Sequence, residues 1–122
     1  MRPVLATAAL LALAAAPASA QQRAASEGEQ IFNLVCAMCH SVNPPAKAAP
    51  PMSHAAAYYV RKYREKPAIV AAMVAYLKEP AAEKSAMPAH AIERFGLMPS
   101  QGHLSEQQLR AAAEYVITLA DT

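Results

Sequence analysis

The pentapeptide Cys36-Ala37-Met38-Cys39-His40 holds the side chains best suited to chemistry in this sequence. Two thiols separated by two residues and followed at once by an imidazole are typical of a site where c-type haem is attached covalently. One helical turn between the cysteines directs both sulfurs to two vinyl groups on one porphyrin edge. We therefore predict thioether bonds from Cys36 and Cys39 and iron ligation by His40.

Three other fates of the two cysteines stay open. A thioredoxin-like redox pair expects a βαβ pattern around it, and the sequence shows none. A structural zinc site normally needs four protein ligands. It would recruit both cysteines and two histidines, whose spacing fits no usual pattern: His40, His54, His90 and His103. An ordinary disulfide is the third alternative. Haem attachment is favoured over all three.

Residues 1–20 have the pattern of a secretory signal peptide, with a positive start, an apolar run over 4–16 and an Ala-x-Ala ending at Ala20. The run is too short to span a bilayer comfortably, although an uncleaved N-terminal anchor is the alternative. Cleavage after Ala20 removes 20 of the 122 residues and leaves 102. We predict one exported, periplasmic domain over residues 21–122.

The mature chain carries little net charge. Removing Arg2 lowers the formal charge from +2 to +1, which is too weak for a nucleic-acid-binding protein. After the signal peptide no apolar run is long enough to span a membrane. A domain of this size has a small core, and a buried cofactor would add the apolar area that the chain lacks.

Helical periodicity predicts an all-α fold, and no stretch alternates like a half-buried strand. Two capping boxes mark helix starts, at Ser26–Glu29 and at Ser105–Gln108. Residues 21–25 are predicted to fray, and 41–51 to form an irregular loop with four prolines. The predicted helices run from about 27 into the Cys36 region, from Ser53 to near Lys66, from Pro67 to before Pro80, from His90 to Phe95, and from Ser105 to about Ala120.

With these features the chain resembles the class I monohaem c-type cytochromes, the small bacterial kind, over residues 26–120. The resemblance implies a cytochrome c fold, with about four to five helices and loops wrapped around one covalently bound haem c. Gly28 and Phe32 stand where the family has a glycine and an aromatic residue. Tyr115 stands where it has an aromatic residue on the last helix. The family's first and last helices cross closely, and the glycine permits this approach.

The resemblance also implies a methionine as the sixth iron ligand, and a His/Met pair raises the reduction potential of a cytochrome c. Met98 opens a Met-Pro turn shortly before the Leu104-Ser105-Glu106 helix start, where the family places its ligand. Met87, in a second Met-Pro pair, is the alternative ligand. A further alternative is a bis-His site, in which His90 or His103 is the sixth ligand. Met38 is excluded because it lies inside the motif, and Met73 belongs to an apolar helix stripe.

In the family, a proline carbonyl after the motif accepts a hydrogen bond from the ligating histidine. Here Ala49-Pro50-Pro51-Met52 occupies that place, which implies Pro50 as the acceptor and Met52 as a side chain packed on the ring. Because alanine replaces the usual glycine, Pro51 stays open as the acceptor. These prolines would alternatively only stiffen the loop.

Further along, five side chains are candidates to contact a haem propionate, although a solvated helix face is the simpler interpretation of each: Tyr58, Tyr59, Tyr63, Arg61 and Arg64. The basic cluster over 61–64 is also a candidate to steer an acidic redox partner.

We predict an electron carrier and not an enzyme: a periplasmic protein whose haem iron cycles between Fe(III) and Fe(II) and which meets donor and acceptor proteins briefly. The alternative is a haem c subunit that delivers electrons within a periplasmic dehydrogenase or oxidase complex. A haem enzyme or gas sensor is a third hypothesis. It needs an open sixth position, against which Met98 argues.

Overall fold

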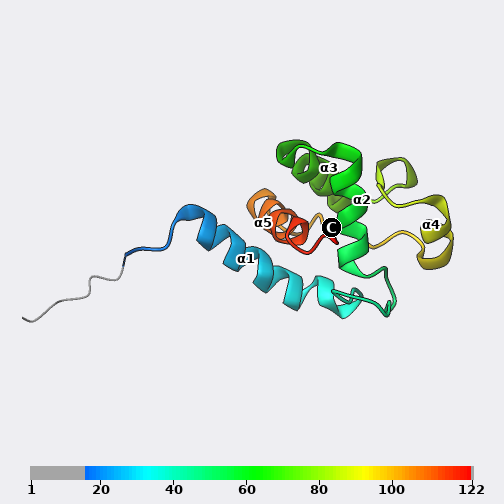
Figure 1. Ribbon diagram of the computed structural model, residues 1–122, viewed down its shortest axis with the longest axis horizontal. Helices are drawn as coiled ribbons and strands as arrows, with labels where there is room; N and C mark the ends of the chain where they lie inside the picture. The colour runs from blue at the N-terminus through cyan, green and yellow to red at the C-terminus, as the bar shows by residue number, and fades with distance from the viewer. Residues whose placement is uncertain (1–15, 122) are drawn as a thin grey trace, which may run out of the picture.

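The computed structural model describes residues 16–121, and every regular element in this range is helical, which confirms the all-α prediction. The elements are α1 (Ala20–Leu34), η1 (Cys36–Met38), α2 (Met52–Tyr63), α3 (Lys66–Lys78), η2 (Ala82–Lys84), α4 (Ala89–Phe95) and α5 (Glu106–Ile117). Figure 1 shows α1 lying against α5, α2 and α3 packed beside them, and α4 far from the start of α1. Within 16–121 no helix has the length and apolar character needed to cross a membrane.

Helix α1 starts seven residues earlier than the sequence predicts, at Ala20 instead of 27. Ser19 is its N-cap: the Ser19 hydroxyl accepts from the Gln22 amide at 3.2 Å, and Gln22 Oε1 accepts from the Ser19 amide at 3.0 Å. The prediction that 21–25 fray and that Ser26 caps the helix is therefore wrong. Alanine, glutamine and arginine residues over 20–25 carry the helix upstream past Ser26 to this earlier capping box.

The middle helices match the prediction with small shifts. Helix α2 begins at Met52 behind the N-cap Pro51, so Ser53 lies inside it and is not its cap. It ends at Tyr63 because Arg64 takes a left-handed conformation, with φ at 63°. Pro67 lies in the first turn of α3, where its missing N–H leaves no gap in the hydrogen-bond ladder.

The last two helices, α4 and α5, have the predicted end and the predicted start respectively. Helix α4 ends at Phe95, as predicted, with Gly96 as its C-cap, and the φ of 75° there suits a residue without a side chain. Ser105 caps α5 and exchanges hydrogen bonds with Gln108, which confirms the second capping box. Helix α5 stops at Ile117, before the predicted end at Ala120.

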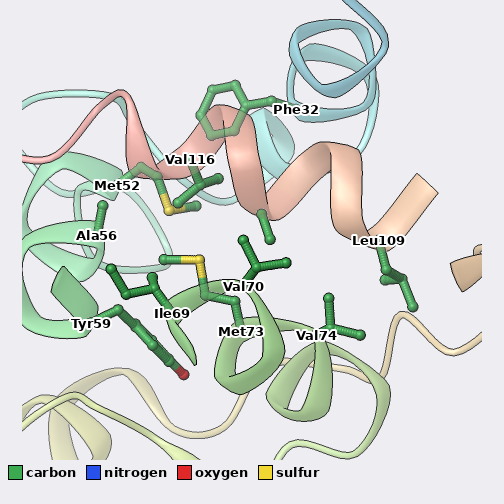
Figure 2. Packing of buried hydrophobic residues seen from close by; sticks show 11 residues of the cluster. Phe32, Met52, Ala56, Tyr59, Ile69, Val70, Met73, Val74, Leu109 and Val116 are labelled. Carbon is green, nitrogen blue, oxygen red and sulfur yellow. The ribbon is translucent and has the colours of Figure 1, made fainter. Parts of the chain in front are cut away.

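The core joins α1, α2, α3 and α5 through one cluster of buried side chains (Figure 2). The predicted apolar stripe of α3 is buried in it, which accounts for Met73 as a core residue. Its members are Phe32, Met52, Ala56, Tyr59, Ile69, Val70, Met73, Val74, Leu109, Ala113 and Val116.

The closest approach in the fold is between α1 and α5 at Gly28. A Cβ atom at Gly28 would overlap the Ala111 carbonyl oxygen and come within 2.8 Å of the Tyr115 Cβ. One turn further on, the rings of Phe32 and Tyr115 pack with centroids 5.6 Å apart and planes inclined by 54°. The crossing that the resemblance implies is therefore present. This crossing fixes the position in space of the end of α1, and therefore that of the Cys36–His40 motif that follows it.

We predict that Gly28→Ala destabilises the protein by about 1–3 kcal/mol, because the added methyl group forces α1 away from α5. Urea unfolding followed by circular dichroism measures this. Gln30→Ala, at an exposed position of the same helix, is the matched control and should change stability by less than about 0.5 kcal/mol. If Gly28→Ala stabilises the protein, as helix propensity alone would favour, the close crossing is wrong.

Candidate functional site

The Cys36–His40 motif forms a tight turn directly after α1. Cys36–Met38 make the 3₁₀ turn η1, and the amides of Cys39 and His40 both donate to the Cys36 carbonyl, at 3.2 and 2.9 Å. Both cysteines are free thiols and both line one cavity. Cys39 is exposed, whereas Cys36 is half-buried and its pKa is raised by burial. The turn thus brings two sulfurs to the edge of the same space.

A hydrogen bond holds His40 in one orientation. Its Nδ1 lies 2.7 Å from the Pro50 carbonyl oxygen. Because a carbonyl oxygen only accepts, Nδ1 must carry the proton, and Nε2 keeps its lone pair free. Burial lowers the pKa of His40, and the hydrogen bond to Pro50 acts in the opposite direction. The result is an oriented, neutral imidazole of the kind that ligates metals.

The loop over residues 41–51 folds back on the motif and fixes the position of Pro50. The Ala49 amide donates to the Cys39 carbonyl at 3.1 Å, and the Met52 amide donates to the Ser41 carbonyl at 2.7 Å. The Lys47 ammonium donates to the Ala37 carbonyl at 2.8 Å. Alanine at position 49 is thus compatible with the turn. The acceptor left open between Pro50 and Pro51 is Pro50.

One apolar cavity of about 290 Å³ brings together most of the residues selected from the sequence: Cys36, Cys39, His40, Pro50, Met52, Met87 and Met98. Both Met-Pro segments reach it, so the lining by itself does not choose between Met87 and Met98. His54, His90 and His103 do not line it. Across residues 16–121 there is no group of three or more His, Cys, Asp or Glu side chains placed to hold a metal ion, as the zinc alternative requires.

Tyr59 presents an unpaired polar group in this cavity. Its side chain is only 6% exposed, yet its hydroxyl makes no hydrogen bond of good geometry to the described residues. Burial raises the pKa of Tyr59 well above its ordinary value, and the nearby Ala86 backbone offsets this only in part. In Figure 2 the hydroxyl points away from the aliphatic side chains of the cluster. A buried donor without a partner indicates that a ligand group belongs beside it.

The other propionate candidates lie outside the cavity lining. The Arg61 guanidinium lies over the Tyr58 ring, 4.6 Å from its centroid, and Tyr63 stacks on Tyr59 with centroids 6.1 Å apart. Arg64 is exposed. Of the five candidates, only Tyr59 faces the site.

Several lining residues were not selected from the sequence, among them Tyr76, Ser85, Ile92 and Phe95. Tyr76 follows Met73 by three residues, so the period of the α3 stripe places it on the same face. Ile92 and Phe95 share one face of α4 by the same rule. No local pattern marks Ser85, which lies in the turn after η2 and accepts a hydrogen bond from the Met87 amide at 3.1 Å.

The residues present fit a covalently held iron macrocycle. The cavity offers apolar walls, two free thiols at one edge, an imidazole with a free Nε2, methionine thioethers and one unpaired hydroxyl. Each of these groups has a use in such a site, and a simple disulfide would leave the imidazole and the cavity without one.

Comparison with known proteins agrees with this chemistry. The sequence matches the family described as Cytochrome c over residues 25–120, which is most of the chain. No curated protein and no solved structure shows a significant match. The match covers the motif, the cavity and all helices except the first turns of α1. On this match and this all-helical structure, the chain belongs to the cytochrome c family, whose members transfer electrons through covalently bound haem c.

Proposed function

We propose that this chain is an exported, monohaem electron carrier in which Cys36 and Cys39 bind haem c and His40 and Met98 ligate its iron. The observation that carries the proposal is the convergence of these four side chains on one apolar cavity, with His40 already oriented by Pro50. When bound, the haem supplies one-electron exchange between Fe(III) and Fe(II), and a His/Met ligand pair raises its potential.

Each residue of the chain has a separate task in this proposal. The two cysteines tether the cofactor at the end of α1, and Pro50 keeps the Nε2 lone pair of His40 directed at the metal. Met98 supplies a soft thioether that favours reduced iron. Met52 adds apolar packing on the cavity wall, where it is buried. With ligands held on both sides, little has to move when an electron arrives.

Export completes the proposal. Residues 1–20 act as the signal peptide, and the periplasm is where the haem is attached. The proposed cleavage point after Ala20 lies at the very start of α1, next to exposed residues in non-helical backbone, 16–19.

Exposed apolar side chains beside the motif favour contact with redox partner proteins. Leu34 is 76% exposed and Met38 is 79% exposed, one turn apart and next to the exposed Cys39. Such side chains suit a brief encounter, and they equally suit the second candidate, a haem c subunit of a periplasmic oxidoreductase complex. Stable co-purification with a larger periplasmic protein would favour the subunit.

A redox-titrated absorption spectrum of protein expressed in the periplasm tests the proposal as a whole. We expect one covalent haem per chain, and its loss from the Cys36→Ala and Cys39→Ala double variant. We also expect the reduced protein to bind no carbon monoxide, because Met98 fills the sixth position. Rapid binding of carbon monoxide would contradict six-coordinate electron transfer and favour a gas-binding role.

Removing the thioether identifies the sixth ligand. We predict that Met98→Ala abolishes the weak near-infrared sulfur-to-iron band and lowers the reduction potential, because a softer ligand is lost. Met87→Ala is the matched control, since Met87 lines the same cavity and also precedes a proline. It should keep the band. The opposite pattern would make Met87 the ligand.

Tyr59 gives a second test of the site. We predict that Tyr59→Phe lowers the reduction potential by roughly 20–60 mV, because losing one hydrogen-bond donor leaves a haem carboxylate less compensated and favours Fe(III). Tyr58→Phe is the control, since Tyr58 lies under Arg61 and does not line the cavity. Equal potentials in wild type and Tyr59→Phe would show that the hydroxyl has no such partner.

The signal peptide has a direct test by intact mass. Protein recovered from the periplasm should begin at Gln21, because Ala18 and Ala20 supply the small side chains that cleavage requires. Ala20→Leu should leave uncleaved protein in the membrane fraction. Recovery of the full chain from wild type would favour an uncleaved anchor.

A further inference from the structure

The segment after Met98 is tied to the end of helix α3. The Ser100 hydroxyl donates to the Lys78 carbonyl at 2.5 Å, and the Gln101 amide donates to the Leu77 carbonyl at 2.7 Å. The last carbonyls of a helix have no partner within the helix. Here they hold the chain two and three residues beyond Met98.

Ser100 also rigidifies the segment itself. Its hydroxyl oxygen accepts from the Gly102 amide at 3.1 Å while it donates to Lys78. A Cβ at Gly102 would come within 3.2 Å of that oxygen, so this turn is tight. Beyond it, Glu106 at the start of α5 forms an ion pair with the Lys78 ammonium. The turn after Met98 thus lies between two helix ends that are bonded to each other.

Tyr76 lies on the cavity wall together with Met98. Its side chain is half-buried, and burial raises the pKa of its hydroxyl, which the Met98 backbone lowers. Three consecutive residues at the end of α3 therefore face the segment over 98–101. We call Tyr76, Leu77 and Lys78 the α3 clamp. The other Met-Pro segment is held differently, since the Met87 amide bonds only within its own turn, to Ser85.

We propose that the α3 clamp positions Met98 and sets how readily this methionine leaves the iron, with Ser100 and Tyr76 as positioning residues. The inference rests on the proposed function, in which Met98 is the sixth ligand. A Met98 sulfur whose backbone is held at a helix end would return readily to the iron, so an external ligand would compete poorly. Loosening the segment after Met98 would let the external ligand remain bound to the iron.

Imidazole binding to the oxidised, haem-loaded protein measures this competition, because the imidazole nitrogen takes the coordination position that the Met98 sulfur leaves. We expect Ser100→Ala to raise the affinity for imidazole about fivefold, as the loss of one net hydrogen bond implies. Tyr76→Phe should raise it in the same direction, and Ser100→Thr should restore the wild-type affinity. The near-infrared band should persist without imidazole in all three.

Thr118→Val is the matched control. The Thr118 hydroxyl also donates to a helix carbonyl, that of Tyr115 at 2.6 Å, but at the end of α5 and outside the cavity lining. Its imidazole affinity should equal that of wild type. Because Ser100 is exposed, Ser100→Ala should unfold at the same urea concentration as Thr118→Val to within about 0.3 M, which separates local loosening from loss of the fold.

The outcomes separate the two proposals. Unchanged imidazole affinity in both Ser100→Ala and Tyr76→Phe, while Met98→Ala still removes the near-infrared band, overturns the clamp and leaves the ligand assignment standing. Loss of the band in Met87→Ala instead of Met98→Ala overturns the proposed ligand, and the clamp with it. An equal rise in affinity in Thr118→Val also overturns the clamp, because it assigns the effect to general destabilisation.

Discussion

The contact between Gly28 and the Ala111 carbonyl is the constraint on which the site depends. No larger residue fits between α1 and α5 at this point, and the Phe32–Tyr115 pair packs one turn away. Because the motif follows α1 without a linker, the angle of this crossing decides where both thiols lie. A shift of α1 would move the two tethers and the imidazole together. The crossing thus determines the positions of the cavity's thiols and imidazole, even though neither Gly28 nor Ala111 lines the cavity.

On each of the two sides of the cavity, hydrogen bonds to backbone carbonyls hold an irregular segment in place, where apolar packing of the segment itself contributes little. On one side, residues 41–51 return to the motif through amides that donate to Cys39 and Ser41, and Pro50 orients His40. On the other side, the segment after Met98 uses the carbonyls that end α3. Backbone hydrogen bonds thus hold both segments with few apolar side chains of their own, which leaves apolar side chains for the cavity wall.

Much of this site could be predicted from the sequence, because the motif compresses two tethers and one ligand into five adjacent residues. Pro50 followed from the resemblance. The start of α1 could not be predicted correctly: Ser26–Glu29 forms a good capping box, but helix formers upstream extend the helix to Ser19. The resemblance favoured Met98 over Met87 as the sixth ligand. The contacts that hold the segment after Met98 could not be predicted, because they involve backbone carbonyls of α3, which residue types do not reveal.

The Ser19 cap has a consequence for the proposed export. Cleavage after Ala20, as proposed, would remove the residue that caps the start of α1 and would leave a charged amino group at Gln21, at the positive end of the helix dipole. The next sequence able to cap the helix is Ser26–Glu29, just ahead of the Gly28 crossing. Processing would then exchange one helix start for another and shorten α1 toward the Gly28 crossing. The precursor and the mature carrier would share a haem site but differ in the length of their first helix.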